Sequence, residues 1–292
     1  MRTAEFYKFI REREMIRLRK EAGSPWPWTQ DPILQEYKFT NVKREHDKTT
    51  RKLKEVYHNA AIPARIYEPD FPEEMHLMNC ATYRYFGTWE FAWDLGYLCK
   101  WDPEHVKELA RERASEGKPV FTGAYVITNQ GIKAPKIDVV VDHFLTPLHA
   151  AASDVVSFIK KTKSWRLAIG RMSQVQGFGG TGFMAKEVML DTLFTPLWEG
   201  KDPVDFNTWC PAGPGARRGL NRLHFRELDK PMKPEAALEE MLALFELRGQ
   251  YWSKNAVKLC LHDIQFQLCE FDKYERVRLG EGRPRSKYKR PV

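Results

Sequence analysis

The chain has 292 residues, of which 42% are hydrophobic and 29% charged, a composition typical of a globular protein in water. It contains no apolar run of about 18 residues and no apolar signal core at its N-terminus, so the pattern argues against a membrane span and against export. Five scattered cysteines without a CxxC pair indicate reduced thiols and a cytoplasmic location. The net charge of +8 favours a polyanionic partner such as DNA or RNA.

Apolar residues recur at helical spacing along most of the chain, which predicts an all-α fold. The pattern is compatible with one helical domain over 1–292, including two lobes around a groove, and with a basic tail over 281–292. Residues 120–145 are ambiguous, because Val139, Val140 and Val141 favour a strand while their flanks resemble short helices. An extended connection is expected over 63–72. The expected helices, in chain order, cover residues 3–20, a segment starting at Asp31-Pro32, 45–57, 74–99, 103–114, 148–162, 164–175, 182–198, the segment after Gly215, 234–247 and 253–278.

Positive charge is concentrated in two places. Six basic residues fall within 43–54 and five within 283–290. A basic tail alone is often only a solubilising end, but here it accompanies a basic helix. Together they favour nucleic acid as the partner.

The segment 209–223 contains two glycines one residue apart, followed by arginines. A tight turn there exposes backbone N–H groups at a helix start, where the helix dipole favours an anion. The pattern resembles the glycine hairpin of helix-hairpin-helix DNA-binding proteins, which holds a backbone phosphate. The alternative is a simple helix start with solvated arginines. The residues expected to bind DNA are Gly213, Gly215, Arg217, Arg218 and Asn221.

The last expected helix carries the clearest candidate acids. Beside its apolar stripe runs a second stripe, formed by Asp263, Gln267, Glu270 and Tyr274. Asp263 and Glu270 are seven residues apart and share a face, where partial burial raises a carboxylate pKa towards the range of a general base. The alternative is an amphipathic helix in which Glu270 pairs with Lys273 or Tyr274.

The glycine-rich segment 176–182 does not fit a phosphate-binding loop of the Walker A type, because no GK[ST] follows at the required distance. Such a loop can still hold phosphate or serve only as structure, and the sequence favours neither reading. No zinc site is expected, since Cys260 and His262 point to different sides of a helix. A divalent metal stays compatible with the sequence, but no cofactor is firmly implied.

Several long blocks resemble the alpha-glutamyl/putrescinyl thymine pyrophosphorylase family, and the resemblance extends over about residues 5–288. The blocks are Arg11–Gly23, Pro25–Thr29, Asp31–Glu45, Gln176–Phe183, Gly213–Asn221 and Leu268–Tyr274. The family includes phage amino acid:DNA transferases and the helical domain found with 5-hydroxymethyluracil DNA kinases. Its fold is similar to that of helical DNA glycosylases. In those enzymes the catalytic aspartate follows the hairpin by about one helix, whereas Asp263 lies about 50 residues beyond Gly215.

The resemblance implies a transferase that acts on double-stranded DNA carrying 5-(pyrophosphoryloxymethyl)uracil. The amine of a free amino acid or polyamine would replace the pyrophosphate, on a base flipped out of the duplex. In this hypothesis Asp263 is the general base, Glu270 is its partner or the anchor of the amine, and Lys273 faces the leaving phosphates. The residues expected to bind the substrate are Arg44, Gln176, Gly177, Phe178, Thr181 and Lys186.

Two other functions are compatible with the sequence. A DNA glycosylase acting on a modified pyrimidine would share the implied fold and an essential aspartate. A non-catalytic reader of modified DNA needs only the basic surface. A kinase is disfavoured for this chain by the missing Walker A loop.

Overall fold

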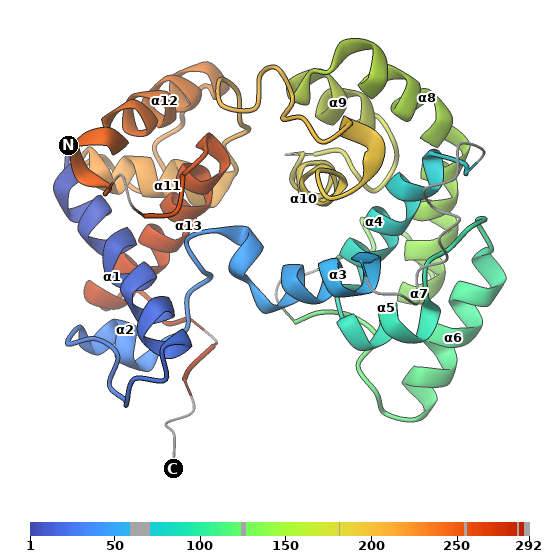
Figure 1. The fold of residues 1–292 in the computed structure, drawn as a ribbon, viewed down its shortest axis with the longest axis horizontal. Helices are drawn as coiled ribbons and strands as arrows, with labels where there is room; N and C mark the ends of the chain where they lie inside the picture. The colour runs from blue at the N-terminus through green and yellow to red at the C-terminus, as the bar shows by residue number, and fades with distance from the viewer. Residues whose placement is uncertain (59–70, 124–126, 181, 254–255, 285, 289–292) are drawn as a thin grey trace. The chain divides into compact units, whose positions relative to one another are not determined.

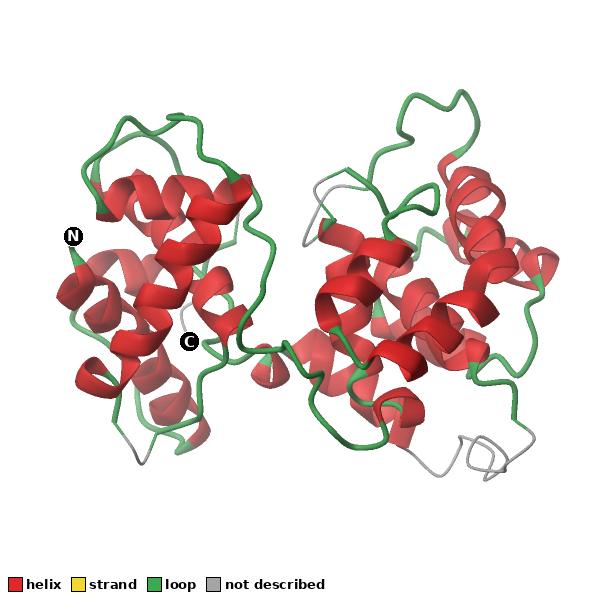
Figure 2. Cartoon of the chain, turned by 90° about the horizontal axis from the view of Figure 1, so that it is seen from above, coloured by secondary structure: helices red, strands yellow, loops and turns green. Residues whose placement is uncertain are grey.

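A computed structural model of the protein describes residues 1–292 apart from 59–70, 124–126, 181, 254–255, 285 and 289–292. Every regular element in the described part is helical, as Figure 2 shows, and the all-α prediction is confirmed. The β-type pairing found there is an isolated antiparallel bridge between Tyr37 and Lys287. None of the described helices is long and apolar enough to cross a lipid bilayer.

The chain divides into two compact units by its internal contacts. Unit 1 combines Met1–Asp47 with Asn207–Val292, and unit 2 is the intervening segment Lys48–Phe206 (Figure 1). The helices of unit 1 are α1 (Thr3–Glu21), α2 (Pro32–Glu36), η1 (Arg44–His46), α11 (Pro214–Leu223), α12 (Pro234–Tyr251) and α13 (Leu261–Arg278). Those of unit 2 are α3 (Lys48–His58), α4 (Glu74–Phe86), α5 (Trp89–Leu95), α6 (Pro103–Ser115), α7 (Lys136–Asp138), η3 (Val139–Leu145), α8 (Thr146–Thr162), α9 (Trp165–Met172), α10 (Phe183–Thr192) and η4 (Pro196–Trp198).

Two helices begin where the sequence predicts, directly after a capping aspartate. Asp31 caps α2 by accepting hydrogen bonds from the backbone N–H groups of Ile33 (2.9 Å) and Leu34 (3.0 Å), with Pro32 as the first helical residue. Asp102 caps α6 in the same way, through the N–H of His105 at 3.1 Å. In both cases the carboxylate satisfies N–H groups that have no partner inside the helix.

Several expected elements differ from the observed ones. The helix expected over 182–198 ends at Thr192, with η4 after it. The extended connection expected over 63–72 lies mostly outside the described residues. The single helix expected over 74–99 is broken at Gly87, whose φ of +67° favours glycine and where a Cβ would lie 2.6 Å from Thr122. The valines at 139–141, ambiguous by propensity, belong to the π-helical segment η3, where burial overrides their strand preference. The last helix begins at Leu261 rather than near Ser253, because Asp263 accepts the N–H of Cys260 and so caps the helix there.

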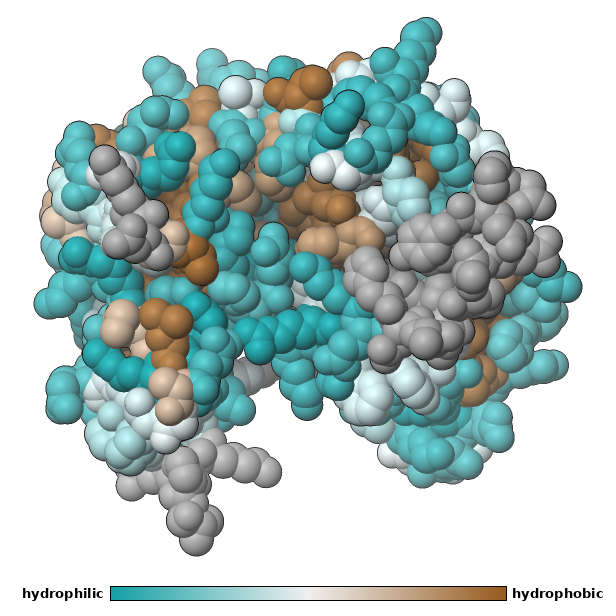
Figure 3. Space-filling model, viewed as in Figure 1, coloured by the Kyte–Doolittle hydropathy of each residue, from teal (hydrophilic) through white to brown (hydrophobic). Residues whose placement is uncertain are grey.

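The core of unit 1 is formed where α1, α11, α12 and α13 pack together. Phe6, Ile10 and Phe271 are among its fully enclosed apolar side chains. Hydrophilic side chains predominate on the face of the protein drawn in Figure 3, and apolar ones appear there as separate patches. Packing against α1, α11 and α12 fixes the position of α13, the helix that carries the predicted acids.

The most extensive helix packing among the described residues of unit 1 joins α11 to α13. Gly219 of α11 lies against the backbone of α13, and a Cβ at this position would lie 2.3 Å from the carbonyl oxygen of Leu268. A glycine in a helix interior is otherwise unfavourable, so close approach of the two backbones explains this residue.

We predict that Gly219→Ala destabilises unit 1 by about 2 kcal/mol or more, because the added methyl meets backbone rather than a flexible side chain. Gly249→Ala in α12 is the matched control, since nothing lies within 4 Å of its Cβ position. The control is expected to leave stability unchanged or to raise it by about 0.5–1 kcal/mol. Urea unfolding of the two variants measures the difference, and equal effects at both positions would refute the packing argument.

Candidate functional site

Asp263 lies at the start of α13 and is almost completely buried, with 2% of its surface exposed. Its Oδ2 atom accepts hydrogen bonds from Lys43 Nζ at 2.8 Å and from the backbone N–H of Cys260 at 2.8 Å. Burial raises the pKa of Asp263, while the nearby Lys43 ammonium and the Cys260 N–H oppose that rise. The result is a carboxylate with increased proton affinity, held beside a cation.

Lys43 is the cationic partner in this pair. Burial disfavours its charge, but the Asp263 carboxylate, together with Cys260 and Glu45, raises the pKa of Lys43 above its ordinary value. The ammonium therefore stays charged throughout the physiological range. The two residues are 220 positions apart in the sequence, and the fold of unit 1 brings them together.

Gln267 and Glu270 of the predicted polar stripe bind the segment that precedes Lys43, whereas Tyr274 donates to Asp31. Gln267 donates to the carbonyl oxygen of Val42 at 3.0 Å, and Glu270 accepts the N–H of Thr40 at 3.1 Å. Lys273 donates to Glu270 Oε1 at 2.6 Å, so the predicted pairing of these two residues is present. Asp263, Gln267 and Glu270 thus share one face of α13, and each contacts the segment 40–43.

Arg13 of α1 belongs to the same cluster. Its guanidinium donates to Gln267 Oε1 and to the carbonyl oxygen of Thr40, and it lies 4.8 Å from the centre of the Phe9 ring. Burial lowers the pKa of Arg13, and the charges of Glu270 and Asp47 oppose that effect. A buried arginine between α1 and α13 adds cationic character to a cluster of carboxylates.

Asp47 and Arg44 lie at the end of this cluster, where the chain leaves unit 1. Asp47 accepts the N–H of Asn41 at 2.8 Å, and burial raises the pKa of Asp47 to about 6. Arg44, expected to bind substrate, lies 5.8 Å from the centre of the Phe266 ring of α13. The structure thus places Arg44 in the same unit as Asp263, Glu270 and Lys273.

The glycine-rich hairpin forms the start of α11. Gly213 is its N-cap residue with extended backbone, and neither Gly213 nor Gly215 adopts a positive φ. A Cβ at Gly215 would lie 3.1 Å from Cys269 Sγ, so this glycine serves packing against α13. Pro214 occupies the first helical position and has no N–H to offer an anion.

The arginines of α11 contact groups of their own unit. Arg218 and Arg222 both donate to the buried carboxylate of Asp272, at 3.1 and 2.8 Å. Arg217 donates to the carbonyl oxygen of Ala212 at 3.0 Å. Asn221, also expected to contact DNA, is buried and donates to the carbonyl oxygens of Leu228 and Lys230. These bonds fix the loop after α11.

The other predicted substrate-binding residues belong to unit 2. Gln176 is exposed, whereas Gly177 is buried and Phe178 is fully buried against Tyr85, with ring centres 5.3 Å apart. Lys186 in α10 is also buried and lies 3.2 Å from the carboxylate of Glu187. Thr181 lies outside the described residues.

Sequence reasoning missed the contribution of three residues to the cluster around α13. Lys43 was recognised only as one of several basic residues, while Arg13 and Asp47 were not singled out. Their pairing with α13 depends on contacts between distant segments, and no local spacing reports such contacts. Within the described ranges, no group of three His, Cys, Asp or Glu side chains is arranged to hold a metal ion.

The raised pKa of Asp47 predicts a pH dependence of stability. Because the folded pKa of about 6 exceeds the ordinary 3.8, Asp47 stabilises the folded state most below about pH 4, and this contribution is lost as the pH rises through 6. Relative to Asp47→Asn, the wild type should therefore gain stability when the pH falls from 7 to 4.5. Urea unfolding at the two pH values measures this difference, with the exposed Glu246→Gln as control. A difference that does not change with pH would contradict the assignment.

Comparisons with known proteins agree with this helical architecture. The sequence profile described as "5-hmdU DNA kinase, helical domain" matches residues 2–283. A 5-hmdU DNA kinase of Bacillus phage SP10 is 25% identical, over 86% of this chain and 41% of that protein. The chain thus spans about two fifths of the length of this curated relative. No solved structure matches the chain. With nearly all of its length matched, the chain belongs to the family of 5-hmdU DNA kinase helical domains.

Proposed function

We propose that the chain functions in the modification of thymine in DNA, as a transferase on bases that carry 5-(pyrophosphoryloxymethyl)uracil. The observation that carries the proposal is the family match over residues 2–283, together with a phage relative named as a 5-hmdU DNA kinase. A kinase adds phosphate to the hydroxymethyl group, and a phosphorylated hydroxymethyl group is a substrate for displacement. The net charge of +8 supports DNA as the partner.

The proposed reaction exchanges one bond for another at the exocyclic carbon. The nitrogen of an amine forms a bond to this carbon, and the bond from the carbon to the pyrophosphate oxygen breaks. Pyrophosphate leaves with the electron pair, and the proton lost by the amine passes to a carboxylate. Cationic side chains that neutralise the leaving group lower the barrier.

Asp263 and Glu270 are the proposed carboxylates, with Lys273 facing the phosphates. Burial raises the pKa of Asp263, which makes it a better proton acceptor, and Lys43 lies 2.8 Å away. Glu270 is within 2.6 Å of Lys273, whose side chain is 41% exposed. Proton transfer at Asp263 would require the pair with Lys43 to open towards the substrate.

One observation favours a second function, that of a non-catalytic domain recognising modified DNA. Asp263 is 2% exposed, and its Oδ2 atom is already bonded to Lys43 and Cys260. A carboxylate in this position can serve stability alone. In this alternative the chemistry belongs to another protein, and the chain contributes only affinity for DNA.

We predict that the wild-type chain, incubated with pyrophosphorylated hydroxymethyluracil DNA and a panel of amines, releases pyrophosphate and yields a heavier nucleoside. Nucleoside mass spectrometry measures the product. Abasic sites instead of an adduct would indicate a glycosylase. Binding of the DNA without any change in its mass would instead support the DNA-recognition function.

The double variant Lys43→Met/Asp263→Asn separates catalysis from stability. It removes both charges together, so no unpaired charge stays buried, and the fold should persist. If Asp263 accepts the proton, the double variant should bind DNA but lose the adduct by about 100-fold or more. Glu246→Gln, at an exposed position of α12, is the control for carboxylate loss. Full activity in a folded double variant would remove Asp263 from the mechanism.

A further inference from the structure

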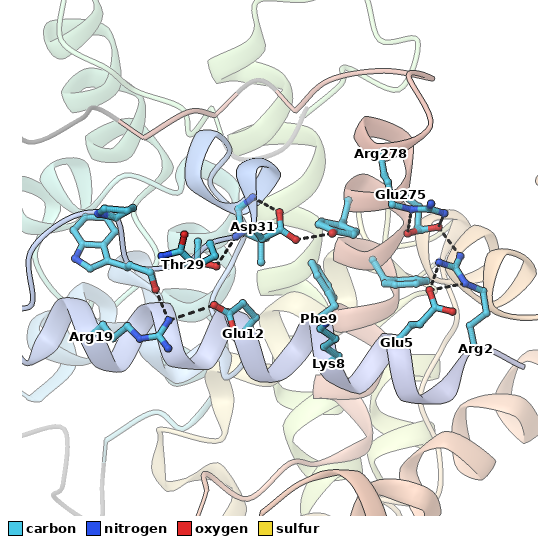
Figure 4. A pocket seen from close by; sticks show the side chains of 16 residues that line it. Arg2, Glu5, Lys8, Phe9, Glu12, Arg19, Thr29, Asp31, Glu275 and Arg278 are labelled. Carbon is cyan, nitrogen blue, oxygen red and sulfur yellow. Dashed lines mark hydrogen bonds and ion pairs between the residues drawn. The ribbon is translucent and has the colours of Figure 1, made fainter.

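A cavity in the described part of unit 1 lies between α1, the segment 27–34 and the C-terminal half of α13. Its volume is about 730 Å³, within the range of small-molecule sites. Figure 4 shows that the lining side chains contributed by α1 form three groups along that helix. Arg19 and Glu12 lie at one end, Arg2 and Glu5 at the other, and Lys8 and Phe9 in between.

The charged groups at both ends already neutralise one another. Glu12 pairs with Arg19 at 3.3 Å, and Glu5 pairs with Arg2. Glu275 of α13, almost fully buried, pairs with Arg278 at 2.7 Å. The ends of the cavity therefore carry little net charge for a ligand.

Two charged groups in the middle of the cavity have no oppositely charged partner among the described residues. Asp31 uses Oδ1 to cap α2, and its Oδ2 accepts the hydroxyl of Tyr274 at 2.6 Å, but no basic side chain pairs with it. Lys8 is exposed on α1 and forms no ion pair there. A carboxylate keeps further lone pairs after these bonds, so Asp31 can accept from an ammonium group.

Aromatic rings line the same part of the cavity. Phe9 and Tyr274 pack with ring centres 5.0 Å apart, and Trp28 lines the wall. Rings beside a carboxylate favour an ammonium group, because the ring face attracts a cation. Lys8 offers a site for a carboxylate and repels a second ammonium.

We propose that this cavity binds a zwitterionic amino acid, with its ammonium at Asp31 over the aromatic rings and its carboxylate at Lys8. The complementary pair of unneutralised charges distinguishes an amino acid from a polyamine, which would place a second cation near Lys8. That this ligand is the amine donor rests on the proposed function. The binding itself does not depend on it.

The position of the cavity bears on the choice between the two proposed carboxylates. Tyr274 lies eleven residues beyond Asp263, about 16 Å along α13, and only about 6 Å beyond Glu270. A donor bound in this cavity is therefore nearer to Glu270, and the site is separate from the Lys43–Asp263 pair.

Isothermal titration calorimetry on the full chain without DNA tests the proposal, with glycine, L-serine, L-glutamate and putrescine as ligands. At least one amino acid should bind the wild type with a Kd of about 1 mM or below, and more tightly than putrescine. Asp31→Asn keeps an oxygen for the helix cap, and Lys8→Gln changes an exposed residue, so both variants should fold. Each should weaken binding about tenfold.

Lys201→Gln and Glu246→Gln are the matched controls, since both positions are exposed and neither residue lines the cavity. They should bind like the wild type. No binding of any amino acid at about 10 mM, or equal binding by Asp31→Asn, Lys8→Gln and the controls, would overturn the proposal. Tighter binding of putrescine would also overturn it. Binding without adduct formation would instead count against the proposed function alone, while adduct formation without binding here would count against this site alone.

Discussion

The ion pair between Lys43 and Asp263 is the constraint on which much of unit 1 depends. It joins the segment before α3 to the first turn of α13, and the same carboxylate caps that helix through the N–H of Cys260. Two charges away from water are costly unless each has a partner, so each of these residues requires the other. The start of α13 and the course of residues 40–47 are therefore determined together.

Close packing between α11 and α13 imposes a second constraint. Gly219 allows the two backbones to approach, and Arg218 and Arg222 of α11 then reach the buried Asp272 of α13. The segment that resembles a phosphate-binding hairpin thus also stabilises the packing of α11 against α13. For the arginines to hold DNA, a phosphate would have to compete with, or add to, the carboxylate of Asp272.

Much of the helical pattern could be read from the sequence, because apolar spacing and helix caps act over a few residues. Asp31 and Asp102 show this, since each caps a helix at the expected position. The polar stripe Asp263, Gln267 and Glu270 was likewise visible from helical spacing. What these residues bind was not visible, because Thr40, Val42 and Lys43 meet them only after the chain has folded. The break at Gly87 was missed although its signal is local, since a glycine with left-handed φ ends α4 there.

A double-mutant cycle on Lys43 and Asp263 tests most directly whether this buried pair organises unit 1. The free energy of unfolding is measured for Lys43→Met, Asp263→Asn and the double variant. Each single variant leaves one charge buried without its partner and should lose about 3–5 kcal/mol, whereas the double variant should lose clearly less than the sum. Small and additive losses would show that the pair is not the constraint on which the unit depends.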